Sequence, residues 1–168
     1  AMAASGLGLS TLLLTGNVDH IGQLSCNPAI GGLAKGHMVR EIDALGGFMG
    51  LWADASGIQF RTLNTSKGPA VRSTRAQMDR AAYQKVVSSS LFSRKNLWVR
   101  QAMVEEVLTE DGRVCGVKTL LGETILTRFV LLTTGTFLQG LIHVGLKNFP
   151  GGRFGDAASQ GLSASLRN

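Results

Sequence analysis

Phe129-Val130-Leu131-Leu132-Thr133-Thr134-Gly135-Thr136 is the stretch that decides the expected fold. Its first four residues are apolar, which favours a strand buried on both faces and is typical of a parallel sheet. The stretch ends in small residues and glycine, a pattern that lets backbone approach a nucleotide at the carboxyl end of such a sheet. By itself the Thr134-Gly135 pair fits the end of a plain structural strand equally well.

The segments that precede this stretch predict a mixed α/β chain. Residues 10–15 form an apolar, strand-like run, apolar residues recur at helical spacing from Ile30 to Leu45, and Thr74 is placed to cap a helix that reaches about Ser90. Shorter strand-like runs follow at residues 97–101, 104–109, 114–120 and 124–126. Asp111-Gly112 predicts a tight hairpin turn between two of them.

This order of elements is typical of two-dinucleotide-binding flavoproteins: a strand, a helical layer, a short antiparallel β meander and a final strand. The glycine fingerprint that holds a pyrophosphate after the first strand of such domains does not occur in this sequence. We therefore expect an α/β, Rossmann-like FAD-binding domain that is incomplete. It is a single domain over residues 1–168, without its first strand and fingerprint and without carboxyl-terminal regions.

Composition describes a folded chain with an affinity for anions. The sequence is 44% hydrophobic and 17% charged, which argues against disorder. No apolar run approaches the roughly 20 residues that cross a bilayer, so we expect no membrane association. Seventeen Lys and Arg against eleven Asp and Glu give a net charge of +6, which favours polyanionic partners.

The basic residues are concentrated in one stretch, opposed there only by Asp79. A solvated helix face is the alternative explanation for such a run. The residues are Arg61, Lys67, Arg72, Arg75 and Arg80.

Two cysteines in dissimilar contexts fit a reducing compartment better than a disulfide framework. Cys26 lies in Ser25-Cys26-Asn27-Pro28-Ala29-Ile30-Gly31-Gly32, directly before the expected helix, where the helix dipole favours a reactive thiolate. Cys115 lies in an apolar strand and is expected to be a packing residue. We assign no metal ligands.

Six separated blocks resemble the GidA (also called MnmG) family of tRNA uridine 5-carboxymethylaminomethyl modification enzymes. The resemblance runs over essentially the whole chain, and the blocks stand in the family's order. The blocks are residues 25–32, 36–47, 67–72, 74–77, 134–138 and 151–153. Family members are considerably longer, so the chain is expected to be an internal fragment.

The resemblance implies an FAD enzyme that acts on the wobble uridine of tRNA together with a GTPase partner. It also implies methylenetetrahydrofolate as one-carbon donor, NADH as reductant, a homodimer when the chain is complete, and a bacterial cytoplasmic location. We expect the isolated chain to be inactive and to retain FAD weakly or not at all, because a pyrophosphate would lack the aligned N–H donors of the fingerprint.

The family's site residues carry over to matching positions. Cys26 matches the active-site cysteine, with a role either in attack on the pyrimidine ring or in handling a flavin-bound one-carbon unit. The carried-over FAD contacts are the backbone of Val104 and the hydroxyl of Ser159, to which the strand end adds Thr134 and Gly135. Lys67, Arg72 and Arg75 are expected to face phosphate, either the tRNA backbone or the anionic folate and flavin groups.

The sequence departs from the family pattern at two places. Gly16 stands where family members usually have histidine, and no acidic side chain follows to hold the cofactor ribose, so Asn17 or the main chain would have to serve. Ala157 and Ala158 replace the prolines that commonly precede the serine, which predicts a less rigid loop.

Two other functions stay open from the sequence. A folate- and FAD-dependent tRNA uracil methyltransferase shares the flavin scaffold and a similar cysteine block, although the run from Lys67 to Arg72 argues against it. The second alternative is that the chain is a noncatalytic fragment whose positive charge alone binds tRNA.

Overall fold

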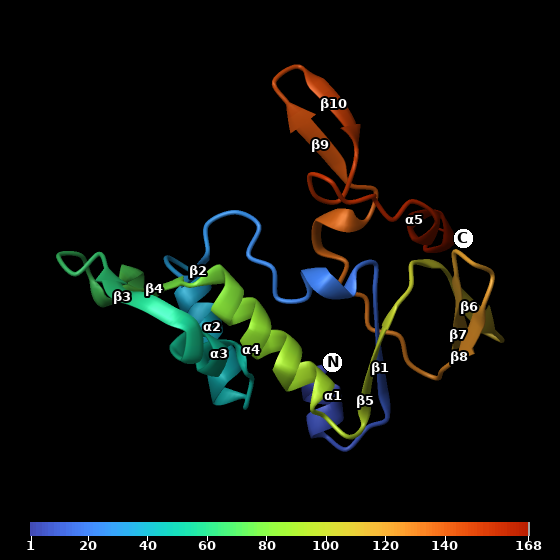
Figure 1. Ribbon diagram of the computed structural model, residues 1–168, viewed down its shortest axis with the longest axis horizontal. Helices are drawn as coiled ribbons and strands as arrows, with labels where there is room; N and C mark the ends of the chain where they lie inside the picture. Colours follow the sequence, from blue (N-terminus) through green and yellow to red (C-terminus); the bar gives the residue numbers. More distant parts are fainter. Residues whose placement is uncertain (168) are drawn as a thin grey trace. The chain divides into compact units, whose positions relative to one another are not determined.

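The structure is a computed structural model that describes residues 1–167 (Figure 1). It is a mixed α/β fold, as the sequence predicts. Its contacts divide the chain into two compact units. Unit 1 comprises Ala1–Leu13 and Asn17–Arg100, and unit 2 comprises Leu14–Gly16 and the residues from Gln101 onward.

Two parallel strands, β1 (Thr11–Thr15) and β5 (Leu97–Gln101), form a two-stranded sheet. At one end the Thr11 N–H donates to the Asn96 carbonyl at 3.0 Å, and at the other the Ala102 N–H donates to the Thr15 carbonyl at 2.9 Å. Both bonds advance in the same direction along the two segments, so the strands run parallel. This pair supplies the parallel element that the expected Rossmann-like fold requires.

Unit 1 also holds a three-stranded antiparallel sheet in the order β2-β4-β3. Its strands are β2 (Ala29–Gly31), β3 (Gly57–Leu63) and β4 (Ser73–Met78). The helices of the unit are α1 (Met2–Gly6), η1 (Val18–His20), α2 (Lys35–Ala44), α3 (Met49–Ser56), η2 (Pro69–Val71) and α4 (Arg80–Phe92). The strands β3 and β4 form a long hairpin whose loop contains η2 (Figure 1).

The core of unit 1 lies between α3, β4 and α4. Tyr83, Val87 and Leu91 recur every four residues and bury one face of α4, as an amphipathic helix does. Met78 is 2% exposed and, with Ala76, faces this core from β4. Each buried side chain of this size stabilises the fold by about 1.5–3 kcal/mol relative to exposure, so the core fixes β4 and, through it, the neighbouring strands.

Unit 2 contains the predicted antiparallel meander. Its strands β6 (Val104–Glu110), β7 (Arg113–Thr119) and β8 (Thr124–Leu126) pair in sequence order. Asp111 and Gly112 form the turn with φ values of 49° and 72°, the positive values that a type I′ turn requires, so the predicted hairpin is confirmed. The remaining elements are η3 (Gly135–Phe137), the hairpin of β9 (Leu141–Val144) and β10 (Lys147–Pro150), and α5 (Gly161–Ser165).

The final strand predicted at residues 129–136 is wrong in this structure. Residues 129–134 have no regular secondary structure, and the segment ends in η3. Phe129 is 84% exposed and Leu131 is 81% exposed. A strand forms only where a neighbour accepts its backbone hydrogen bonds, and within residues 1–167 no strand pairs with this segment.

Two helix boundaries are also corrected. The helix expected from Ile30 begins at Lys35, because Ile30 pairs with Ala76 of β4 instead. The helix expected from Thr74 begins at Arg80, after β4, and its cap is Asp79, whose Oδ1 accepts the Ala82 N–H at 2.9 Å. In both places pairing with a neighbouring strand overrides the local helical pattern.

The buried phenol of Tyr83 makes a prediction about alkaline stability. Tyr83 is the only tyrosine, and burial raises the pKa of its hydroxyl above the usual 10.0. Between pH 10 and the raised pKa, the unfolded chain releases this proton while the folded chain keeps it, so stability falls as pH rises. We expect Tyr83→Phe to lose less stability than the wild type above about pH 10 in urea unfolding. Equal losses in both proteins would contradict it.

Candidate functional site

Cys26 lies on an exposed loop of unit 1 that leads into β2. The loop is held by β4 and the start of α4. The Arg80 guanidinium donates to the Cys26 carbonyl at 2.5 Å, and the Met78 N–H donates to the Pro28 carbonyl at 2.6 Å. The backbone on either side of the cysteine is therefore fixed, while the residue itself stays accessible.

The expected helix directly after Cys26 is absent, since β2 intervenes and α2 begins only at Lys35. The influence of a helix dipole falls off within the first turn. The dipole of α2 is therefore not a reason for reactivity at Cys26. A charged group does contact this loop, namely the guanidinium of Arg80 at the Cys26 carbonyl.

Arg80 is the residue that sequence reasoning missed, since its place in the basic run fits a solvated cation equally well. It is separated from Cys26 by 54 positions, and nothing in the sequence pattern links the two. The contact arises because β4 pairs with β2 and α4 follows β4 after a single residue.

The turn between β2 and α2 is compact and strained. Gly31 and Gly32 have φ values of +94° and +97°. Ala34 has φ 59° and ψ −50°, and the Lys35 N–H donates to the Leu33 carbonyl at 2.7 Å across it. That geometry is a γ-turn with positive φ, which is rare and strained for a residue with a side chain. The strained Ala34 lies after β2, the strand that the cysteine loop enters.

Lys67, Arg72 and Arg75 are brought together on the β3–β4 hairpin, as the sequence grouping suggests. Arg72 Nε donates to the Lys67 carbonyl at 3.0 Å, and Asn64 Nδ2 donates to the Val71 carbonyl at 2.9 Å. The bond from Asn64 joins the two ends of the loop, and the bond from Arg72 joins one end to its middle. The loop that carries Lys67 and Arg72 is therefore ordered. A contact between these cations and phosphate stays a prediction.

Ser159, Thr134 and Gly135 come together in unit 2. The Ser159 N–H donates to the Phe137 carbonyl at 2.8 Å, and Thr134 is the residue directly before η3, whose first residue is Gly135. Gly135 has φ +57°, and no atom would lie within 4 Å of a side chain added there. Ser159 is buried, with 6% of its surface exposed. The open space beside the Gly135 backbone is what would admit the polar rim of a dinucleotide.

Val104, the first residue of β6, lies near that segment in unit 2. Its neighbour Glu105 packs so closely against Gly161 that a side chain at Gly161 would overlap the carboxylate. The Val107 N–H donates to Ser165 Oγ of α5 at 3.1 Å. The start of β6 therefore adjoins the segment that carries Ser159, as a shared cofactor site requires.

Asn17 begins the turn after β1, close in sequence to the carboxyl end of that strand. Its Oδ1 accepts the Asp19 N–H at 2.9 Å and caps η1. The carboxamide oxygen therefore has a local role, and a contact between Asn17 and a cofactor ribose stays a prediction. A side chain at Gly16 would meet Met103 Sδ at 2.7 Å, so a larger residue there would need Met103 to move.

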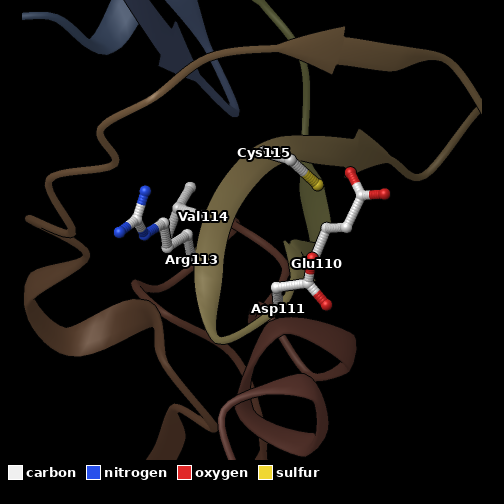
Figure 2. Close-up of a pocket in the computed structure, with 5 residues that line it drawn as sticks. All are labelled: Glu110, Asp111, Arg113, Val114 and Cys115. Atoms are coloured by element: carbon white, nitrogen blue, oxygen red, sulfur yellow. The ribbon is translucent and has the colours of Figure 1, made fainter.

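Figure 2 shows a hollow beside the β6–β7 turn that contains none of the expected site residues. It is lined by Glu110, Asp111, Arg113, Val114 and Cys115. Cys115 is half-buried on β7 rather than fully packed. Within residues 1–167 no group of three or more His, Cys, Asp or Glu side chains is placed to share a metal ion. In the same residues, no helix combines the length and apolarity that a bilayer crossing demands.

Comparison with known sequences identifies close relatives. A sequence model of the family described as glucose inhibited division protein A (GIDA) matches residues 1–168. The tRNA uridine 5-carboxymethylaminomethyl modification enzyme MnmG of Geobacter sulfurreducens is 56% identical over all 168 residues. The chain spans 27% of the length of that relative.

Solved structures give the same result. The structure of Aquifex aeolicus GidA in its form II crystal matches 99% of this chain and 28% of its own, with a TM-score of 0.93 and 49% identity. A GidA-related protein from Thermus thermophilus matches 95% of this chain and 67% of its own, with a TM-score of 0.53 and 17% identity. At that low identity the second match shows the fold alone.

The exposure of Cys26 makes a prediction about thiol chemistry. Cys26 is exposed and Cys115 is half-buried, and access governs which thiolate an alkylating reagent reaches. We expect iodoacetamide to label Cys26 several-fold faster than Cys115, as measured by peptide mass spectrometry over time. In Cys26→Ser, only slow labelling should remain, and faster labelling of Cys115 in the wild type would contradict the arrangement.

Two neighbouring glycines provide a matched test of the turn before α2. Gly31 and Gly32 both have positive φ, but a side chain at Gly31 would overlap the Thr74 carbonyl, whereas the space at Gly32 is open. We expect Gly32→Ala to lower the free energy of unfolding by about 1–2 kcal/mol and Gly31→Ala by about 2–5 kcal/mol, since it adds overpacking. Urea unfolding followed by circular dichroism measures both, and equal losses would disprove the close approach of β2 to β4.

Proposed function

Because the chain belongs to the GidA family, whose sequence model matches residues 1–168, we propose that it is part of an enzyme that modifies the wobble uridine of tRNA. The reaction is the addition of a carboxymethylaminomethyl or aminomethyl group to C5 of that uridine. The observation that carries the proposal is the exposed Cys26 on a loop anchored by Arg80, in the block that resembles the family's active site.

The proposed cofactor is FAD, with NADH and methylenetetrahydrofolate as co-substrates. FAD would supply redox chemistry and a carrier for the one-carbon unit. Two observations at Thr134, Gly135 and Ser159 support this assignment: the space beside the Gly135 backbone is open, and the Ser159 backbone is bonded to Phe137, the last residue of η3. Val104 would contribute its backbone N–H and carbonyl, and Asn17 would contact the ribose.

The proposed partners are tRNA, a GTPase and a second copy of the complete enzyme, in the bacterial cytoplasm. The net charge of +6 supports a polyanionic substrate. Lys67, Arg72 and Arg75 would face the phosphates of the tRNA from the β3–β4 hairpin.

Each residue near the thiol then has a separate task. Cys26 presents a sulfur nucleophile from an exposed position, and attack requires its thiolate form. Arg80 holds the backbone of the cysteine loop through the Cys26 carbonyl and acts as a positioning residue. The pairing of β2 with β4 keeps that loop beside the start of α4.

A chimeric enzyme tests the proposal. This chain replaces the matching 27% of the Geobacter enzyme, and tRNA incubated with FAD, NADH, methylenetetrahydrofolate and the GTPase is analysed by nucleoside mass spectrometry. We expect the chimera to modify C5 of the wobble uridine. Cys26→Ser should abolish product, by a factor of about 10³ or more as for loss of a nucleophile, and Cys115→Ser should preserve it.

Two results would count against this function. A methyl group as the only product would instead support the uracil methyltransferase alternative. Full activity of Cys26→Ser would exclude a catalytic role for this cysteine and favour a chain that serves only to bind tRNA.

A further inference from the structure

The face of the β2-β4-β3 sheet that lies opposite the core carries a ladder of polar side chains. Arg61 of β3 lies directly across from Arg75 of β4, and Gln59 lies across from Gln77. Directly paired residues in an antiparallel sheet point to the same face, and successive residues alternate. The core faces the other side, where Ala76 is buried.

The neighbouring strand leaves this ladder uncovered. On β2, Gly31 pairs with Arg75 and Ala29 pairs with Gln77, so β2 adds no side chain larger than a methyl group beside them. Arg61 and Gln59 are exposed, and Arg75 and Gln77 are half-buried. These four residues, Gln59, Arg61, Arg75 and Gln77, form a polar surface that is named here the arginine platform.

The two guanidinium groups have no partner of opposite charge. Within residues 1–167, neither Arg61 nor Arg75 forms an ion pair or a side-chain hydrogen bond. The hairpin from Gly57 to Met78 contains four basic residues and no Asp or Glu. Like charges directly opposite each other destabilise a sheet by up to about 1 kcal/mol. The pairing of Arg61 with Arg75 therefore does not stabilise the folded chain by itself. A bound anion between the two guanidinium groups would offset their repulsion.

The cations continue along the hairpin toward its tip. Beyond the Arg61 and Arg75 pair, the chain reaches Lys67 and Arg72, whose loop is held by the bonds from Arg72 to Lys67 and from Asn64 to Val71. One pair of cations would be enough to bind a single phosphate group, and this hairpin has two pairs. The four cations are separated along the hairpin, one pair within the strands and one pair in the loop beyond them, and cations at separate positions along a hairpin match a linear polyanion.

We propose that the arginine platform binds the phosphodiester backbone of RNA. Guanidinium groups match phosphate oxygens with two parallel hydrogen bonds, and the carboxamides of Gln59 and Gln77 can donate to phosphate or accept from a ribose 2′-hydroxyl. The inference deepens the proposed function, on which it rests for tRNA as the polyanion. It assigns Arg61 and the two glutamines to substrate binding, and it makes Arg61 and Arg75 act as a pair.

The test measures binding of a fluorescein-labelled RNA anticodon stem-loop to the 168-residue chain by fluorescence anisotropy over a series of salt concentrations. The test variant is Arg61→Gln/Arg75→Gln. The matched control is Lys85→Gln/Lys95→Gln, which removes the same charge from positions of unit 1 outside the platform.

We expect the arginine variant to bind RNA at least about tenfold more weakly and the lysine variant to stay within about twofold. The slope of log affinity against log salt should decrease by about 1.4 for two lost contacts with single-stranded phosphates. Equal losses in the two variants would reduce the effect to net charge and overturn the proposal. Unchanged binding by the arginine variant would overturn it as well.

Two further measurements separate the remaining explanations. The melting temperature of the arginine variant should equal or exceed that of the wild type, and a fall of more than about 4 °C would make the pair structural. Poly-glutamate should compete with RNA poorly, since stronger competition at equal charge would indicate an acidic polypeptide as partner.

The proposed function and this inference fail separately. Modification of tRNA by the chimera with an unchanged KM in the arginine variant would overturn the platform, including the contact of Arg75 with phosphate, and would leave the proposed activity standing. RNA binding that depends on Arg61 and Arg75, without modification by the chimera, would overturn the proposed activity alone.

Discussion

The pairing of β2 with β4 is the interaction on which the candidate sites of unit 1 depend. It joins Ile30 to Ala76, and Ala76 belongs to the buried core. The same contact sets the Cys26 loop beside Arg80 and leaves a strip of small residues next to Arg75. Removing it would free the cysteine loop and the cationic face together, because both derive their position from one strand that is itself held by burial of Met78.

In the β3–β4 hairpin, packing supplies stability and the basic side chains supply positive charge. On one face of β4, Ala76 and Met78 are buried and supply stability, whereas Arg61 and Arg75 point to the opposite face and no acidic residue occurs between Gly57 and Met78. Such an arrangement costs some stability in the free protein and favours association with anions. The strained turn at Ala34 joins this small sheet to α2, and strain of this kind is found preferentially where function constrains the backbone.

Much of the architecture follows from local sequence. The alternation and the Asp111-Gly112 turn predict the meander, and the spacing of Tyr83, Val87 and Leu91 gives α4 its buried face. The fold class and the grouping of Lys67, Arg72 and Arg75 were likewise predictable. Local pattern failed at Ile30, at Thr74 and at residues 129–134, where the presence or absence of a pairing strand decides the structure. Backbone pairing is a non-local property that periodicity does not contain.

The sequence by itself determined the family, the reactive residue type at position 26 and the excess of cations, because each of these is a matter of residue identity and order. Only the tertiary structure placed Arg80 on the cysteine loop, set Arg61 opposite Arg75, and bonded Ser159 to Phe137 in the segment that follows Thr134. These contacts join residues that are distant in the chain, and they exist because burial and strand pairing bring the elements into register.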